Sequence, residues 1–287
     1  MTLARPIPGF ERDQDRPRNL LERLLALGRP IVMGVLNVTP DSFSDGGRFF
    51  DAATALDQAR RMVAEGADIL DIGAESTRPY GGAVAVPIEE EIRRLAPILP
   101  TAVALGVPVS IDTMKAGVAE QAIATGAAIV NDVWGLQRDR ELARVVAEHG
   151  VPVIVMHNRD AADPSLDIMT DIAAFFARSL EIADRAGIVR DNIVLDPGIG
   201  FGKTPEQSLT AIARLTELKS FGLPLLVGAS RKRFIDKVSP APPDRRLGGS
   251  IAAHLNAVAG GAAIIRTHDV AETVQALRVD AAIRSAR

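Results

Sequence analysis

Polar or charged side chains follow eight short apolar segments of this 287-residue chain, at positions where a buried strand does not require them. Short segments rich in Val and Ile are typical of strands covered on both faces, as in a parallel sheet. The segments are 31–36, 69–70, 107–111, 127–130, 151–156, 193–195, 223–228 and 262–265, and the residues that follow them are Asn37, Asp71, Asp112, Asn131, His157, Asp196, Ser230 and Arg266. Parallel α/β folds bind ligands at the carboxyl ends of their strands, so the pattern predicts one active-site face.

The segment 196–204, Asp-Pro-Gly-Ile-Gly-Phe-Gly-Lys-Thr, nearly matches a phosphate-binding P-loop. Pro197 stands where that motif has its first glycine, and the third glycine of a dinucleotide fingerprint is absent, so neither nucleotide motif is met. What remains is a carboxylate, Asp196, at a strand end. The glycine-rich turn after it lets the backbone and Phe201 approach a flat ligand.

Arg266 and His268 lie two residues apart after the last apolar segment. Their side chains face the same way if the backbone stays extended. Barrel phosphate sites commonly form around the last two strands, so the pair predicts anion binding. The alternative for His268 alone is a place at the surface where the last helix starts.

Helical patterns and glycines alternate with the apolar segments. Apolar residues recur at helical spacing at 52, 55, 56, 59, 62 and 63, at 172, 175, 176, 179, 182 and 183, and at 270, 274, 277 and 281. A capping box is expected at 204–207. A residue in the left-handed conformation often ends a helix, and glycine adopts this conformation most easily. A glycine is found between each helical pattern and the next apolar segment at Gly66, Gly106, Gly126, Gly150, Gly187, Gly222 and Gly260.

Eight strands and eight helices over about 250 residues predict a single-domain α/β fold, the (β/α)8 TIM barrel. A doubly wound open sheet is the alternative. Residues 1–28 are predicted to form a tail with a short helix at 20–27, and residues 29–287 the barrel.

Composition narrows the functional classes. The net charge is −3 and 47% of the residues are hydrophobic, so nothing points to a nucleic-acid partner. No Cys is present, which excludes disulfides, thiol nucleophiles and cysteine-bound zinc. No segment is apolar enough over the length of a membrane span, and residues 1–18 lack the apolar stretch of a secretion signal. We therefore expect a cytoplasmic protein.

The segment 37–47 is longer than a βα turn requires and carries one aromatic residue, Phe43. Such a loop at the catalytic face of a barrel favours a lid that orders over substrate, with an ordinary turn as the alternative.

Seven motifs in chain order resemble the dihydropteroate synthase family. They lie at 33–47, 71–79, 110–113, 130–133, 196–203, 230–232 and 266–269, and the resemblance covers about residues 30–280. It implies condensation of 6-hydroxymethyl-7,8-dihydropterin diphosphate with 4-aminobenzoate, which gives 7,8-dihydropteroate and diphosphate by SN1-like loss of diphosphate. It also implies Mg²⁺, a homodimer formed through helices near the C-terminus, and sensitivity to sulfonamides.

The resemblance also implies residue roles. The pterin pocket would consist of Asp112, Asn131, Met156, Asp196, Phe201 and Lys232. The aminobenzoate pocket and its loops would consist of Phe43, Thr77, Arg78, Pro79, Phe201 and Lys232. Diphosphate would contact Asn37, Arg78, Arg266 and His268, with Asn37 also a Mg²⁺ ligand. The residues expected to act in catalysis are Asp112, Asp196, Lys232, Arg266 and His268.

Some points stay open. Arg233 stands where other members have a Ser that holds the aminobenzoate carboxylate, and Tyr80-Gly81-Gly82 departs from the second loop. Asp112 and Asn131 have a second interpretation as helix caps, and His157 is better explained as a structural histidine. The rival functions are a methyltetrahydrofolate-dependent corrinoid methyltransferase domain and a non-catalytic pterin-binding homologue.

Overall fold

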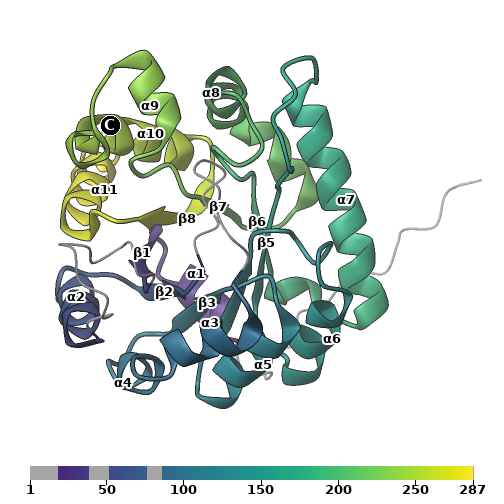
Figure 1. Cartoon of the computed structure of the whole chain (residues 1–287). Coiled ribbons are helices and arrows are strands. Elements are labelled where there is room, and N and C mark those ends of the chain that lie inside the picture. The colour runs from purple at the N-terminus through teal and green to yellow at the C-terminus, as the bar shows by residue number, and fades with distance from the viewer. Residues whose placement is uncertain (1–18, 39–51, 76–85, 287) are drawn as a thin grey trace, which may run out of the picture.

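Eight parallel strands close into a barrel in the computed structural model, which describes residues 19–38, 52–75 and 86–286. Each strand pairs with its neighbour in sequence, and β1 pairs with β8 to close the ring (Figure 1). The strands are β1 (Ile31–Asn37), β2 (Ile69–Gly73), β3 (Val109–Asp112), β4 (Ile129–Asp132), β5 (Val153–Met156), β6 (Ile193–Asp196), β7 (Leu225–Val227) and β8 (Ala262–Thr267). The predicted (β/α)8 barrel is confirmed, and the open sheet is excluded.

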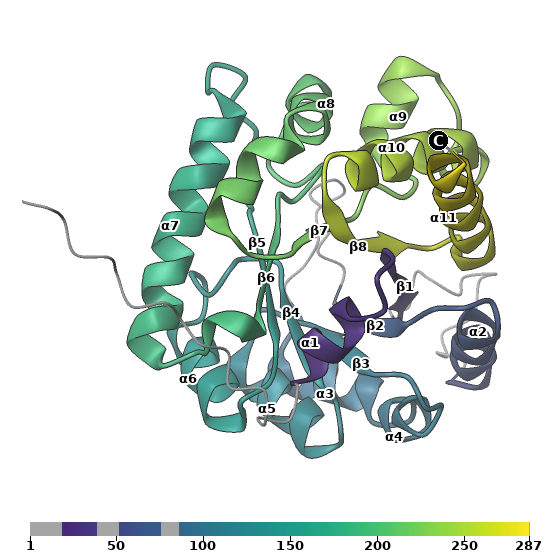
Figure 2. The ribbon, with the colours of Figure 1, turned by 180° about the vertical axis from the view of Figure 1, so that it is seen from behind.

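Most of the helices surround this ring, and the first lies across the end where the strands begin (Figures 1 and 2). They are α1 (Leu20–Leu25), α2 (Ala52–Ala64), α3 (Ile88–Leu95), α4 (Leu99–Val103), α5 (Ala116–Ala124), α6 (Arg140–His149), α7 (Ile168–Ala186), α8 (Pro205–Ala213), α9 (Arg233–Val238), α10 (Leu247–Ala259) and α11 (Val270–Ser285). Short 3-10 turns are η2 (Arg190–Asn192), η3 (Leu215–Phe221) and η4 (Pro243–Arg245).

Two of the described crossovers contain a pair of helices where one was predicted. Pro97 separates α3 from α4, and Pro240 with Pro242 separates α9 from α10. Proline has no N–H to donate and clashes with the preceding turn, so a helix cannot run through these positions. The prediction of one helix per crossover was wrong at these two places.

The ends of the helices largely follow the sequence signals. The capping box at Thr204 and Gln207 is present. Six of the seven predicted glycines have positive φ, but Gly260 has φ −73° and Gly261, with φ 102°, makes the turn instead. The helix α10 still ends at Ala259, directly before Gly260. The first helix ends at Leu25 and not at residue 27. The N–H groups of Leu27 and Gly28 donate to the carbonyls three residues before them, which forms tighter turns than the α-helix.

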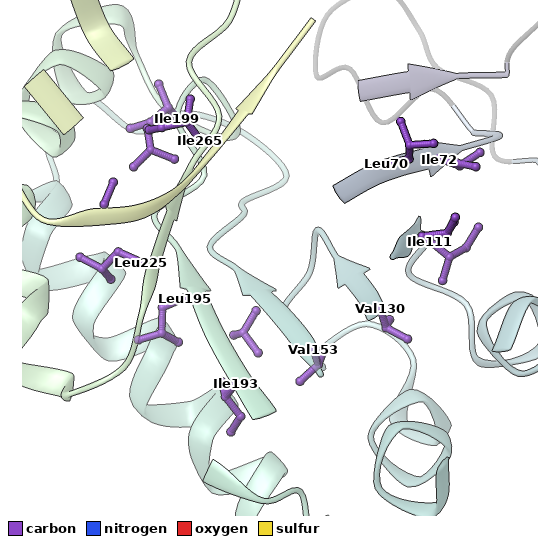
Figure 3. Packing of buried hydrophobic residues seen from close by; sticks show 14 of the residues in the cluster. Leu70, Ile72, Ile111, Val130, Val153, Ile193, Leu195, Ile199, Leu225 and Ile265 are labelled. Atoms are coloured by element: carbon purple, nitrogen blue, oxygen red, sulfur yellow. The ribbon is translucent and has the colours of Figure 1, made fainter. Parts of the chain in front are cut away.

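Two apolar cores hold the barrel. The larger lies between the outer faces of the strands and the helices, and Figure 3 shows part of it, including Leu70, Ile111 and Leu195. The smaller fills the barrel interior, where Ile31, Met33, Ile69, Ile129, Ile154, Val194, Leu226 and Ile264 meet.

The helix α1 belongs to this inner core. Its buried Leu21 and Leu24 pack against the interior residues, and Figure 2 shows it in front of the strands, at the end where they begin. The division at residue 28 stays a prediction. Among the described helices, none is long and apolar enough to cross a membrane.

Candidate active site

The strands deliver their polar residues to one place because their side chains alternate. Interior residues Ile69, Ile129, Ile154, Val194 and Ile264 are each followed two positions later by Asp71, Asn131, Met156, Asp196 and Arg266. Residues two apart on a strand face the same side, so these five side chains also point into the barrel, one layer closer to its carboxyl end. The same alternation puts Asp112 above Ser110 on β3. The predicted active-site face is therefore a polar layer directly above the apolar interior of the barrel.

Arg266 links two of these strands by ion pairs. Its Nε donates to Asp71 Oδ2 at 2.6 Å, and its Nη2 donates to Asp112 Oδ2 at 2.6 Å. Asn131 Nδ2 donates to the same Asp71 oxygen at 3.0 Å. Neither Asp112 nor Asn131 caps the helix that follows, since Lys115 and Asp139 occupy those N-caps. The alternative interpretation as helix caps is therefore wrong.

Two carboxylate oxygens of this cluster have no hydrogen-bond partner among the described residues. They are Oδ1 of Asp71 and Oδ1 of Asp112, both buried. Burial raises the pKa of Asp112 to about 7, against the attraction of Arg266 and with a further rise from Asp71. Buried polar atoms are rarely left unsatisfied in native proteins, so the orphan oxygens fit acceptors for N–H groups of a ligand.

Asp196, Phe201 and Lys232 form the opposite wall. Asp196 Oδ1 accepts the Gly198 N–H at 2.7 Å, and burial raises the pKa of this carboxyl. Lys232 Nζ lies 4.5 Å from the centroid of the Phe201 ring and donates to the Ile199 carbonyl. Burial lowers the pKa of Lys232 to about 7, partly offset by Asp196. This wall offers an acceptor, a donor and an aromatic face.

The turn between β6 and α8 is pressed against the segment after β5. A Cβ on Gly198, which has φ 64°, would lie 1.9 Å from the His157 carbonyl oxygen. A Cβ on Gly202, with φ 51°, would lie 2.4 Å from Cβ of Arg159. Both positions need glycine for the backbone conformation and for the close approach. The turn that carries Phe201 therefore has little room to shift.

Arg266 and His268 have different partners in this structure. His268 donates its backbone N–H to Ser230 Oγ at 3.2 Å, and its Nδ1 lies 3.1 Å from the same oxygen. Asp269, which precedes α11, pairs with Arg231. Both predicted anion-binding residues thus lie at the carboxyl end of β8, where Arg266 faces the carboxylates of β2 and β3 and His268 contacts Ser230 after β7.

The remaining predicted residues divide into two groups. Asn37 ends β1 opposite Gly73, half-buried, and Met156 ends β5 opposite Asp196, buried. Phe43, Thr77, Arg78 and Pro79 lie outside the described residues, as does most of the predicted lid.

His157 is the structural histidine that the sequence favoured. It is fully buried, with Nε2 2.9 Å from Asp171 Oδ2 and Nδ1 2.6 Å from Lys203 Nζ. No binding or catalytic role was predicted from the sequence for Lys203, Asp171 or Asp71. Asp71 had a usable signal, since it stands two residues after the interior Ile69. A buried Lys203 had none, because lysine in a glycine-rich turn is ordinarily exposed.

Comparisons with known proteins agree on one family. The sequence model of one protein family, described as pterin binding enzyme, matches residues 33–268 of this chain. The dihydropteroate synthase of Bacillus subtilis (strain 168) is 45% identical over 243 residues, which cover 84% of each chain.

Solved structures agree as well. That of Xanthomonas albilineans dihydropteroate synthase with 4-aminobenzoic acid has a TM-score of 0.86 at 44% identity, covering 90% of this chain and 94% of that one. A Yersinia pestis dihydropteroate synthase with a sulfonamide drug has a TM-score of 0.84 at 43% identity, covering 91% and 96%.

Proposed function

The chain belongs to the family of pterin-binding enzymes and, within it, groups with the dihydropteroate synthases, and from this premise we propose how its residues share the reaction. It is a transferase that joins 6-hydroxymethyl-7,8-dihydropterin diphosphate to 4-aminobenzoate and releases 7,8-dihydropteroate and diphosphate. The observation that carries the proposal is the layer of inward-facing polar side chains at the strand ends, in which two buried carboxylate oxygens have no hydrogen-bond partner among the described residues. The methyltransferase and non-catalytic alternatives are not supported by the relatives described above.

The ring pocket consists of Asp112, Asn131, Met156, Asp196, Phe201 and Lys232. A pterin is planar, with a guanidine-like edge of N–H donors, and the Asp196 carboxylate suits two of them. Asp112 and Asn131 take further edge groups, and Lys232 donates to a ring carbonyl or nitrogen. A ligand without the matching groups would leave these buried atoms unpaired, which makes such a pocket selective.

The diphosphate pocket lies at the ends of β1 and β8. Arg266 and His268 offer cationic or N–H groups to the anion, and Arg266 remains fully charged between its two carboxylate partners. We place the Arg266 guanidinium where the two pockets meet, because it contacts Asp112 of the ring pocket.

Mg²⁺ fits this pocket as a partner of the substrate. The described residues contain no group of three acidic, histidine or cysteine side chains that could hold a metal. Asn37 offers an amide oxygen, and Mg²⁺ is commonly bound by few protein oxygens together with substrate phosphates and water. When bound, it would neutralise charge on the departing diphosphate.

The chemistry needs no nucleophile from the protein. The bond between the pterin methylene carbon and the diphosphate oxygen breaks, and its electron pair leaves with diphosphate. The resulting cation is delocalised into the electron-rich ring, where the carboxylates of Asp112 and Asp196 stabilise it. The amine of 4-aminobenzoate then forms the C–N bond and loses a proton. Preorganised charges of this kind commonly contribute about 10²–10³ in rate each.

The aminobenzoate pocket borders Phe201 and Lys232. We assign its remaining wall to Phe43, Thr77, Arg78 and Pro79, which lie outside the described residues. Arg78 would also reach the diphosphate. Since the Yersinia relative was solved with a sulfonamide drug, we propose that sulfonamides compete with 4-aminobenzoate here too. Arg233 opens α9 directly after Lys232, so the carboxylate is seated by other groups than the Ser of some relatives.

We also propose a homodimer that forms through the C-terminal helices, and a cytoplasmic location. Large apolar side chains are exposed on α8, α9 and α11, namely Leu209, Val238, Val279 and Ile283. Burying such side chains between two copies would stabilise a dimer.

Two variants test the division into pockets. Asp196→Asn should abolish binding of 6-hydroxymethyl-7,8-dihydropterin in calorimetry, because an amide presents only one acceptor atom. Arg266→Ala should lower turnover by about 10²-fold and weaken binding of this diphosphate-free pterin by less than Asp196→Asn does, because Arg266 supports Asp112 and Asp196 from beside the ring pocket. The exposed Asp160→Asn serves as the control. Normal pterin binding by Asp196→Asn would refute the ring pocket, and loss of pterin binding by Arg266→Ala would move Arg266 into it.

A further inference from the structure

A fully buried lysine lies behind the proposed ring pocket. Lys203 Nζ contacts three acceptors: Nδ1 of His157 at 2.6 Å, the Gly198 carbonyl at 2.9 Å and the Phe201 carbonyl at 3.1 Å. Its side chain is among the largest with no appreciable exposure. A buried cation is costly unless each N–H is paired, and here all three are.

The protonation states follow from these contacts. His157 Nε2 faces the Asp171 carboxylate, so this nitrogen carries the ring proton and donates. Nδ1 then has a lone pair and accepts from Lys203. Burial lowers the pKa of Lys203 well below its usual value, but three acceptors surround Nζ and leave no donor to it, so we assign the ammonium form with three N–H groups. Burial lowers the pKa of His157 to about 3, with Lys203 the next cause, so the imidazole is neutral. Asp171 also accepts from Arg159 at 3.0 Å, which fixes its own orientation.

The carbonyls that Lys203 binds belong to the turn that forms the pocket wall. The N–H of Gly198 donates to Asp196, and Phe201 carries the ring that Lys232 faces. The N–H of Phe201 donates to the Gly198 carbonyl at 3.0 Å, so Lys203 holds both ends of one tight turn. The contact with His157 ties this turn to β5, the strand that contributes Met156.

We propose that Lys203 is a positioning residue of the ring pocket: held by His157 and Asp171, its ammonium fixes the turn 197–202 so that Asp196 and Phe201 are already placed for the pterin. This inference rests on the proposed function, since it assigns the ring to Asp196 and Phe201. A preorganised pocket avoids the cost of ordering its loop when the ligand binds.

Lys203 has a second effect, on the charge of Asp196. The cationic groups that face this carboxylate are Lys232 from the segment after β7, Arg266 from β8 and Lys203 from its own turn. His157 on β5 is neutral and adds no charge. All three cations favour the ionised carboxylate, which is the form that accepts N–H groups from the ring.

The test compares ring binding with diphosphate binding in Lys203→Met. Affinity for 6-hydroxymethyl-7,8-dihydropterin should fall by about 10–100-fold, as when an outer partner of a ligand-binding side chain is lost. Affinity for inorganic diphosphate with Mg²⁺ should stay within about twofold, because Arg266, His268 and Asn37 belong to β1, β8 and the segment after β8, and Lys203 does not position those elements. Equal loss of both affinities, or loss of neither, would overturn the proposal.

Asp171→Ala is a milder variant, because Asp171 is half-buried and contacts Lys203 only through His157. The matched control is Asp160→Asn, at an exposed position between β5 and α7. Asp171→Ala should weaken pterin binding selectively and by less than Lys203→Met, and it decides the matter if Lys203→Met does not fold. A wild-type protein that binds neither pterin nor diphosphate would instead refute the proposed function.

The pH dependence gives a readout that a purely structural lysine would not move. Pterin binding needs ionised Asp196, so it is lost as the pH falls through the pKa of that group. Removing the Lys203 charge raises this pKa, so the acid limb of pterin affinity should move to higher pH in Lys203→Met. An acid limb at the same pH in wild type and variant would contradict the role of Lys203.

Discussion

The electrostatic centre of the site is one guanidinium between two buried carboxylates. Arg266 pairs with Asp71 and Asp112, so three charges share a space from which water is largely excluded. Removing one member of such a buried group commonly costs about 3–5 kcal/mol, because a charge is left without its partner. This arrangement keeps Arg266 charged and holds Asp112 beside it. The site is therefore already organised for a ligand with an N–H edge and an anionic tail.

Lys232 should give the enzyme an alkaline limb. Burial lowers the pKa of Lys232 to about 7, so its ammonium is present below that pH and is lost above it. Since the ammonium donates to the pterin and faces the aminobenzoate pocket, kcat/KM should decline as the pH rises through about 7. Bound substrate anions favour the charged form, so the decline in kcat should lie at higher pH. Measuring both profiles from pH 5 to 9 checks this.

Lys232→Met is the matched variant for this prediction. It should reduce kcat/KM by about 10²–10³ at pH 6 and remove the alkaline limb. The exposed Lys237→Met, one turn into α9, should leave both the rate and the limb unchanged. An alkaline limb that persists in Lys232→Met would assign it to another group.

At the residue scale, the sequence predicted the strand-end residues because strand alternation is a local property. Asp112, Asn131 and Asp196 could be found in this way. The same alternation places Asp71 at a strand end, but its pairing with Arg266 could not be predicted. The roles of Lys203 and Asp171 could not be predicted either, because they depend on tertiary contacts. Likewise, nothing in the sequence shows that Arg266 and His268 take different partners.

At the scale of elements, a buried histidine joins α10 and α11. His254 is almost fully buried, with Nδ1 3.5 Å from Thr273 Oγ1, and its Nε2 has no partner among the described residues. Burial lowers the pKa of His254 to about 4. The unfolded chain takes up this proton near pH 6.5, so the histidine destabilises the fold as the pH falls from 6.5 towards 4.

His254→Met should remove this effect. The free energy of unfolding of the variant, relative to wild type, should rise by about 2 kcal/mol between pH 7 and pH 5. Urea unfolding at the two pH values measures it, and taking the difference cancels the contributions of other titrating groups. An unchanged difference for His254→Met would mean that His254 is protonated in the fold.

Elements were predicted well where a local signal decides them and less well where prolines or tertiary packing intervene. The alternation of apolar segments and glycines gave all eight strands. Pro97 lies between α3 and α4, and Pro100 lies in the first turn of α4, so these two prolines are the sequence signal for the split. The left-handed residue is Gly261 and not Gly260, and two adjacent glycines in a sequence do not show which of them makes the turn.

On the scale of the whole molecule, one end of the barrel is built for stability and the other for chemistry. The helix α1 packs into the interior core at the amino ends of the strands, and the polar layer lies at their carboxyl ends. The fold class could be predicted because strand count and length leave few alternatives. Assembly could not, since exposed apolar side chains appear only once the helices are packed.

Val279 and Ile283 on α11 should form part of the homodimer interface. They lie one helical turn apart and are 52% and 57% exposed, which is unusual for large apolar side chains. Sedimentation of the wild type should give twice the chain mass of 30.5 kDa, and Val279→Glu with Ile283→Glu should give the chain mass alone. Val189→Glu, an exposed valine outside this region, should stay dimeric. A monomeric wild type would refute the dimer.

The most direct test of the central claim is to follow both products of one reaction. Purified protein is mixed with 6-hydroxymethyl-7,8-dihydropterin diphosphate, 4-aminobenzoate and Mg²⁺, and diphosphate and 7,8-dihydropteroate are measured over time. We predict equal amounts of the two products, formed only when 4-aminobenzoate is present and abolished by Asp196→Asn. Tight pterin binding with neither product formed, or methyl transfer from methyltetrahydrofolate, would contradict the account.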